Sequence, residues 1–226
     1  DTRAPAGKTV VGAKMMDEIR FDDIPRFALS GQGCVEITEL LRRENEMGAR
    51  RPWGSIEPFI AALIHVADTT ATEDGCWREL LWELYDYMRT VFIKYGNYYH
   101  RETQQIARMA LAYVRYILSH DRSVVRRIAE EKPISPLAAV ARALLLAKLG
   151  EDVCTELQAA VASWREEWRQ IEEAVERAIE DPEISEAYGL YMERWPPPRP
   201  HSDLEAFLIR QAEELADKCP RRSKDN

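Results

Sequence analysis

Residues 154–178 read CTELQAAVASWREEWRQIEEAVERA, and their apolar side chains recur at alternating steps of three and four residues. This spacing is that of a coiled-coil seam, in which one stripe of side chains faces a partner helix. The candidate protein-interface residues on this stripe are Trp164, Trp168, Ile171 and Val175, since tryptophan is frequent at association hot spots. The partner is either another helix of this chain or a helix of a second subunit, and the spacing leaves both open.

The rest of the chain predicts an all-α fold, because Ala, Leu, Glu and Arg recur at helical spacing and glycine and proline are few. We expect an irregular bundle of about eight or nine helices. Their expected ranges are Val35–Met47, Ile56–Thr69, Glu73–Lys94, Arg101–His120, Ser123–Glu131, Pro136–Leu149, Asp152–Glu180, Ile184–Arg194 and Ser202–Lys218.

Two segments flank the expected bundle of residues 30–195. Residues 1–29 mix proline, glycine and charge, which predicts an extended N-terminal arm. Residues 196–226 are expected to form a proline-rich linker and a C-terminal helix. The run Arg194–Pro200 fits a polyproline II ligand or a stiff spacer, and the last helix has an apolar face that must dock on this chain or on a neighbour. These segments add the candidate interface residues Trp195, Pro197, Pro200, Phe207 and Leu208.

Arginines recur every seven residues along the expected helix Arg101–His120, so they form one narrow stripe on its surface. With the tyrosines just upstream, such a stripe suits a single-stranded nucleic acid, whose phosphates it would neutralise. The alternative is a stripe that pairs with acids of the same chain or lies in water. The candidate nucleic-acid contacts are Lys94, Arg101, Arg108, Arg115, Arg122, Arg126 and Arg127.

Charge and cysteine usage narrow the class of protein. The 226 residues carry 31 Lys and Arg against 39 Asp and Glu, a net charge of −8, which argues against a surface that coats nucleic acid or an anionic membrane throughout. No apolar run is long enough to span a bilayer. The four cysteines form no C-x-x-C pair, so we expect neither a zinc site nor a need for disulfides. A reducing intracellular compartment is expected, either the cytoplasm or an organelle matrix after removal of a presequence.

The motifs that resemble catalytic sites fail on geometry. His120 and Asp121 resemble part of a metal phosphohydrolase site, but His100 lies at the other end of the same expected helix. The carboxylate pair at Glu173 and Glu176 is common in acidic helices and lies on the side opposite the seam. We therefore expect no catalytic residues, no metal, no cofactor and no enzyme activity. An enzyme site assembled from residues distant in sequence would escape this reasoning.

The sequence thus favours a non-enzymatic helical scaffold or structural subunit that binds either other proteins or copies of itself. The alternative hypothesis is an RNA-binding or RNA-packaging protein that uses the arginine stripe.

Overall fold

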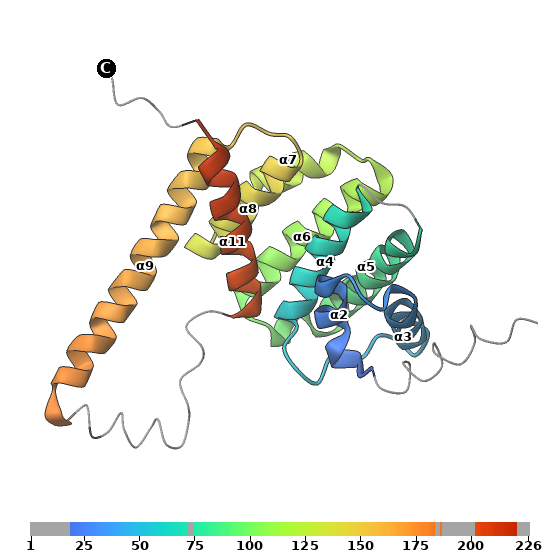
Figure 1. The fold of residues 1–226 in the computed structure, drawn as a ribbon, viewed down its shortest axis with the longest axis horizontal. Coiled ribbons are helices and arrows are strands. Elements are labelled where there is room, and N and C mark those ends of the chain that lie inside the picture. The colour runs from blue at the N-terminus through green and yellow to red at the C-terminus, as the bar shows by residue number, and fades with distance from the viewer. Residues whose placement is uncertain (1–18, 72–74, 184–185, 187–201, 221–226) are drawn as a thin grey trace, which may run out of the picture. The chain divides into compact units, whose positions relative to one another are not determined.

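The computed structural model describes residues 19–71, 75–183, 186 and 202–220, and every regular element among them is a helix (Figure 1). The predicted all-α fold is confirmed. The chain divides into two compact units, residues 1–124 and residues 125–226. The expected single bundle of residues 30–195 therefore contains a division near its middle, and its second part shares a unit with the C-terminal helix.

The first unit is built from short 3₁₀ segments and α-helices. Its elements are η1 (Phe21–Asp23), α2 (Ile24–Ser30), α3 (Cys34–Glu46), α4 (Glu57–Thr70), α5 (Cys76–Tyr95), η2 (Gly96–Tyr98) and α6 (Arg101–Ser119). Helix α4 is the core element, because it packs against α2, α5 and α6 and buries its side chains on nearly every side. Its sequence IAALIHVA, residues 60–67, has a single ionisable group, as expected of a helix that is covered all round.

The second unit contains three long helices that pack against one another. Helix α7 (Ser123–Glu130) crosses the division, and α8 (Pro136–Lys148), α9 (Cys154–Glu180) and α11 (Asp203–Lys218) follow. Helix α8 begins where the Ser135 hydroxyl accepts a hydrogen bond from the Ala138 amide at 3.1 Å, with Pro136 in the first helical position. It packs against both α9 and α11, and these two also pack against each other.

The prediction of an extended N-terminal arm is wrong for the part of this segment that the structure describes. Residues 1–29 were expected to be extended, but Ile24 begins helix α2, and Ile24 and Ala28 are fully buried against the rest of the unit. These residues lie one helical turn apart, and Pro25 occupies the first turn, where a missing amide hydrogen does no harm. Ile19, Ile24 and Ala28 of this segment are therefore core side chains. Residues 1–18 lie outside the described part of the chain.

The cysteine prediction is also wrong, because the structure pairs all four cysteines. One disulfide, Cys34–Cys76, joins the beginnings of α3 and α5, and the other, Cys154–Cys219, joins the beginning of α9 to the residue after α11. The partners are 42 and 65 residues apart in sequence, so only packing of the helices brings them together. Two disulfides do not fit the expected reducing compartment.

The remaining helix predictions match the structure to within a few residues, apart from Ile184–Arg194, which lies mostly outside the described residues. No helix in the described part of the chain has the length and apolar character needed to cross a membrane.

Candidate protein interface on helix α9

The first half of the α9 seam is covered by the chain's own helices. Leu157 is fully buried, Val161 is 3% exposed and Trp164 is 8% exposed, where α8 and α11 pack against α9. For this half of the seam, the partner that the spacing requires is therefore intramolecular. Burial of these side chains supplies much of the free energy that holds the three helices together.

A single carboxylate binds both seam tryptophans. The indole N–H of Trp164 donates to Glu205 Oε1 at 2.6 Å, and the indole N–H of Trp168 donates to the same oxygen at 2.9 Å. The two rings lie 6.3 Å apart, and Glu205 belongs to the first turn of α11. These two hydrogen bonds give the indole N–H groups an acceptor in place of the water that packing removes. They also fix the position of α11 along α9.

Sequence reasoning missed Glu205, although a signal for it exists. Ser202, Glu205 and the spacing between them match a capping box, and the Ser202 hydroxyl does accept a hydrogen bond from the Glu205 amide at 3.2 Å. The motif marks Glu205 as a residue with a defined position at the helix start. It cannot show that the carboxylate binds two indoles of another helix.

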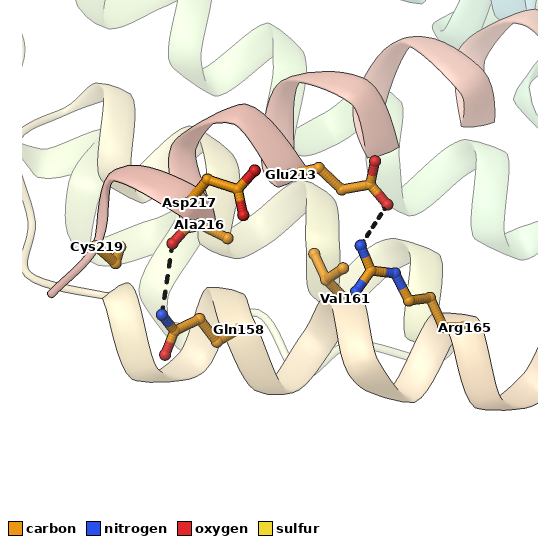
Figure 2. Close-up of a pocket in the computed structure, with 7 residues that line it drawn as sticks. All are labelled: Gln158, Val161, Arg165, Glu213, Ala216, Asp217 and Cys219. Atoms are coloured by element: carbon orange, nitrogen blue, oxygen red, sulfur yellow. Dashed lines mark hydrogen bonds and ion pairs between the residues drawn. The ribbon is translucent and has the colours of Figure 1, made fainter. Parts of the chain in front are cut away.

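A polar hollow of about 480 Å³ lies between α9 and α11, beside the disulfide Cys154–Cys219 (Figure 2). Figure 2 shows two links that cross it, an ion pair of 2.8 Å between Arg165 and Glu213 and a hydrogen bond of 3.5 Å from the Gln158 amide to the Ala216 carbonyl. Its polar lining is thus largely engaged in joining the two helices. We interpret it as part of the contact between α9 and α11.

The second half of the α9 seam extends past these covering helices. Figure 1 shows the end of α9 continuing beyond α8 and α11, and a helix of 27 residues is about 40 Å long against about 24 Å for the 16 residues of α11. Along this end Ile171 is 44% exposed and Val175 is 37% exposed. The structure therefore leaves an apolar stripe of the seam in solvent, and we call residues 171–178 the distal seam.

Charged residues cover the outer face of α9. Arg169 pairs with both Glu166 and Glu173, one turn away on either side, and all three side chains are exposed. Hydrogen bonds from Arg169 and Gln170 lower the pKa of Glu166 to about 2. Exposed ion pairs of this kind contribute little to stability. Here the positive charge of Arg169 offsets negative charge of the neighbouring glutamates on the outer face.

The other predicted interface residues have different positions. Phe207 and Leu208 are buried within the second unit, where α11 packs on α8 and α9, so their apolar surface is covered by the chain itself. The proline-segment candidates Trp195, Pro197 and Pro200 lie outside the described residues.

The predicted arginine stripe lies on the surface of the first unit. Arg101, Arg108 and Arg115 are exposed along α6, and Arg122 follows in the next turn of chain. Arg115 lies 3.7 Å from Asp121, a contact between partly exposed groups.

The other nucleic-acid candidates lie outside this stripe. Lys94 donates a hydrogen bond to the Gly48 carbonyl, and Arg126 and Arg127 are exposed on α7, beyond the unit boundary.

An aromatic hollow of about 340 Å³ opens at the beginning of α6. Trp53 is 98% exposed, Tyr98 is 73% exposed, and the Arg51 guanidinium lies 5.1 Å from the centre of the Tyr98 ring. Tyr98 is one of the tyrosines upstream of the arginine stripe, whereas Arg51 and Trp53 were not predicted and belong to the loop before α4. The signal for them was the run Pro52-Trp53-Gly54, which predicts a loop with an exposed ring.

Compared with protein-family models, with curated proteins and with solved structures, the chain matches none of them.

The residues considered for catalysis do not form one site in the described structure. His100 and His120 flank opposite ends of α6, which separates them by about 30 Å. Within residues 19–71, 75–183, 186 and 202–220, no group of three His, Cys, Asp or Glu side chains is placed to hold a metal ion.

Proposed function

We propose that the protein is a non-enzymatic helical scaffold that binds another protein chain through the distal seam of α9. The observation that carries the proposal is that the seam continues in register past α8 and α11, with Ile171 and Val175 partly exposed. A helix in water keeps such a stripe at a cost in free energy, and the cost is removed when a second helix covers it. Proteins bind helices in this way with side chains spaced three and four residues apart.

The role of the rest of the second unit follows from this proposal. The disulfide Cys154–Cys219 and the bonds from Trp164 and Trp168 to Glu205 hold the first half of α9 firmly. A rigid base presents the exposed end of the helix in one orientation, which reduces the entropy lost on binding.

The experiment compares two double variants of the full chain. Ile171→Asp with Val175→Asp places charges on the distal seam, and Ser163→Asp with Gln170→Asp places the same charges on exposed positions off the seam. We expect the native mass in cell extract, measured by size-exclusion chromatography with light scattering, to exceed 26.1 kDa for the parent chain and the off-seam variant. The seam variant is expected at the mass of the free chain. Equal masses for all three proteins would overturn the proposal.

A second candidate function is binding of single-stranded nucleic acid by the first unit. It is supported by the exposed arginines of α6 and by the exposed rings of Trp53 and Tyr98 in the hollow where α6 begins. Phosphates would contact the arginines and a base would stack on a ring. The overall charge of −8 makes this the weaker candidate, since the rest of the surface repels phosphates.

The test of the second candidate is the salt dependence of binding to a labelled single-stranded RNA. Affinity should fall steeply between 50 and 200 mM salt, on the order of tenfold or more, and the slope should become shallower in Arg108→Ala. Affinity that does not change with salt would exclude the arginine stripe as the contact.

A further inference from the structure

The charges on either side of the distal seam indicate what kind of helix it binds. In a coiled coil, the residues that flank the seam contact the flanking residues of the partner and select it by charge. With Trp168 and Val175 in one seam position and Ile171 in the other, the flanking positions beside them hold Glu167, Glu172 and Ala174. Both carboxylates are exposed.

The arginines of this part of α9 do not offset these flanking acids. Arg165 lies on the flank closer to the helix start, and its guanidinium pairs with Glu213 of α11 at 2.8 Å. Arg169 pairs with Glu166 and Glu173 on the outer face of the helix, and Arg177 donates a hydrogen bond to the Glu173 carbonyl one turn earlier. The two charged side chains on the described flanks of the distal seam, Glu167 and Glu172, are therefore both acidic, and the remaining flanking residue, Ala174, is uncharged.

A second copy of this chain is a poor partner for such a surface. In a parallel pair, Glu167 of one copy would face Glu172 of the other. In an antiparallel pair that aligns the two distal seams, each residue would face residues of its own flank, so Glu172 would approach Glu172. Both arrangements place like charges together as the seam closes, which disfavours them.

We infer that the distal seam binds a basic amphipathic helix of another protein, with aliphatic side chains along its seam and lysine or arginine on its flanks. This inference rests on the proposed function, since it names the partner of the same surface. The aliphatic side chains cover Ile171 and Val175, and the basic flanks pair with Glu167 and Glu172. Such a partner needs about three heptads to cover the exposed turns and a margin at each end.

The test uses two designed peptides of about 21 residues that share leucine and isoleucine at the seam positions. One carries lysine at every flanking position and the other carries glutamate, so each peptide repels its own copies and stays available for binding. Binding to the full, oxidised chain is measured by fluorescence anisotropy of labelled peptide. We expect the lysine peptide to bind at least about tenfold more tightly, with affinity that falls as salt rises from 50 to 500 mM.

Matched variants of the chain locate the contact. Glu167→Lys with Glu172→Lys should reverse the preference and favour the glutamate peptide. Glu173→Lys with Glu180→Lys makes the same charge change on the outer face and should preserve the preference for lysine. Circular dichroism confirms that both variants keep their helix content.

The outcomes separate this inference from the proposed function. Equal binding of the two peptides, no binding of either, or self-association of the chain that Ile171→Asp with Val175→Asp abolishes would each overturn the basic partner. Loss of native mass in that same seam variant would still support the proposed function. No change of mass in the seam variant, together with no peptide binding, would remove both.

Discussion

The two halves of α9 share one sequence pattern but differ in what covers them. In the first half, α8 and α11 bury the seam and Glu205 accepts bonds from both tryptophans. In the second half, the same spacing continues with smaller side chains, acidic flanks and partial exposure. The comparison shows that seam periodicity predicts a surface that needs a partner, and that the length of the neighbouring helices decides where this partner comes from.

The largest loss of stability should come from removing Cys154–Cys219, the disulfide that links the covered half of α9 to the end of α11. Cys154→Ser with Cys219→Ser opens a link between residues 65 apart, and loop-closure entropy predicts a loss of about 4 kcal/mol in the stability of the second unit. Thermal unfolding measures the loss, and hydrogen exchange should show faster opening of the first half of α9. Reduction of the parent chain is the control and should destabilise it similarly. Four reactive thiols in the denatured, unreduced chain would show that the bonds are not formed.

The next largest effect should come from the carboxylate shared by the tryptophans. Glu205→Ala leaves the indole donors of Trp164 and Trp168 without this acceptor, which we expect to cost about 2–3 kcal/mol in urea unfolding. Glu205→Gln keeps an oxygen acceptor and should lose less. The matched control is Glu213→Ala, whose pair with Arg165 is partly exposed and should cost less than about 1 kcal/mol. Equal losses for the two alanine variants would show that the shared carboxylate is not special.

A smaller difference in stability is expected when the same substitution, valine to alanine, is made in each half of the seam. Val161 and Val175 occupy the same seam position two heptads apart, but the first is 3% exposed and the second 37% exposed. Val161→Ala should cost about 2 kcal/mol, because two buried methyl groups are lost, whereas Val175→Ala should change the stability of the isolated chain by less than about 0.5 kcal/mol. Chemical denaturation of both variants under one set of conditions gives the difference. Losses of similar size would mean that the isolated chain already covers the distal seam.

The smallest effect concerns the outer face of the exposed half. The pKa of Glu166 is about 2, below its ordinary value of 4.5, chiefly because Arg169 donates hydrogen bonds to its carboxylate. A lowered pKa means that this pair stabilises the folded helix above about pH 4.5 and ceases to do so as the pH falls through about 2. Carboxyl chemical shifts in an NMR titration report the pKa, and Arg169→Met should raise it toward 4.5. An unchanged titration of Glu166 in that variant would show that the pair does not form in solution.

Local patterns predicted the helices well because each pattern reports the environment of a helix over a few turns. The arginines spaced seven residues apart along α6 do lie exposed on one face, as the spacing requires. Helix α2 was missed because a segment of seven helical residues is too short to establish a period beside proline and charge. Its packing on α4 decides its conformation, and that contact is not local.

The candidate site was predicted only in part, for a related reason. Ile171 and Val175 were identified from spacing alone, and both are partly exposed in the structure. Phe207 and Leu208 belong to the same class of apolar side chain, yet they are buried in their own unit. An apolar face in a sequence shows that something must cover it, and the choice between an internal and an external cover depends on the fold.

The sequence by itself determined that the chain is helical and that α9 carries a continuous seam. These properties follow from side-chain type and helical period, which act within a few turns. Only the tertiary structure decided that the cysteines pair, that one glutamate of α11 binds two tryptophans of α9, and that the cover of the seam stops partway along it. The disulfides and the shared glutamate join residues more than 35 apart in sequence that packing brings together, and no local spacing encodes such a meeting.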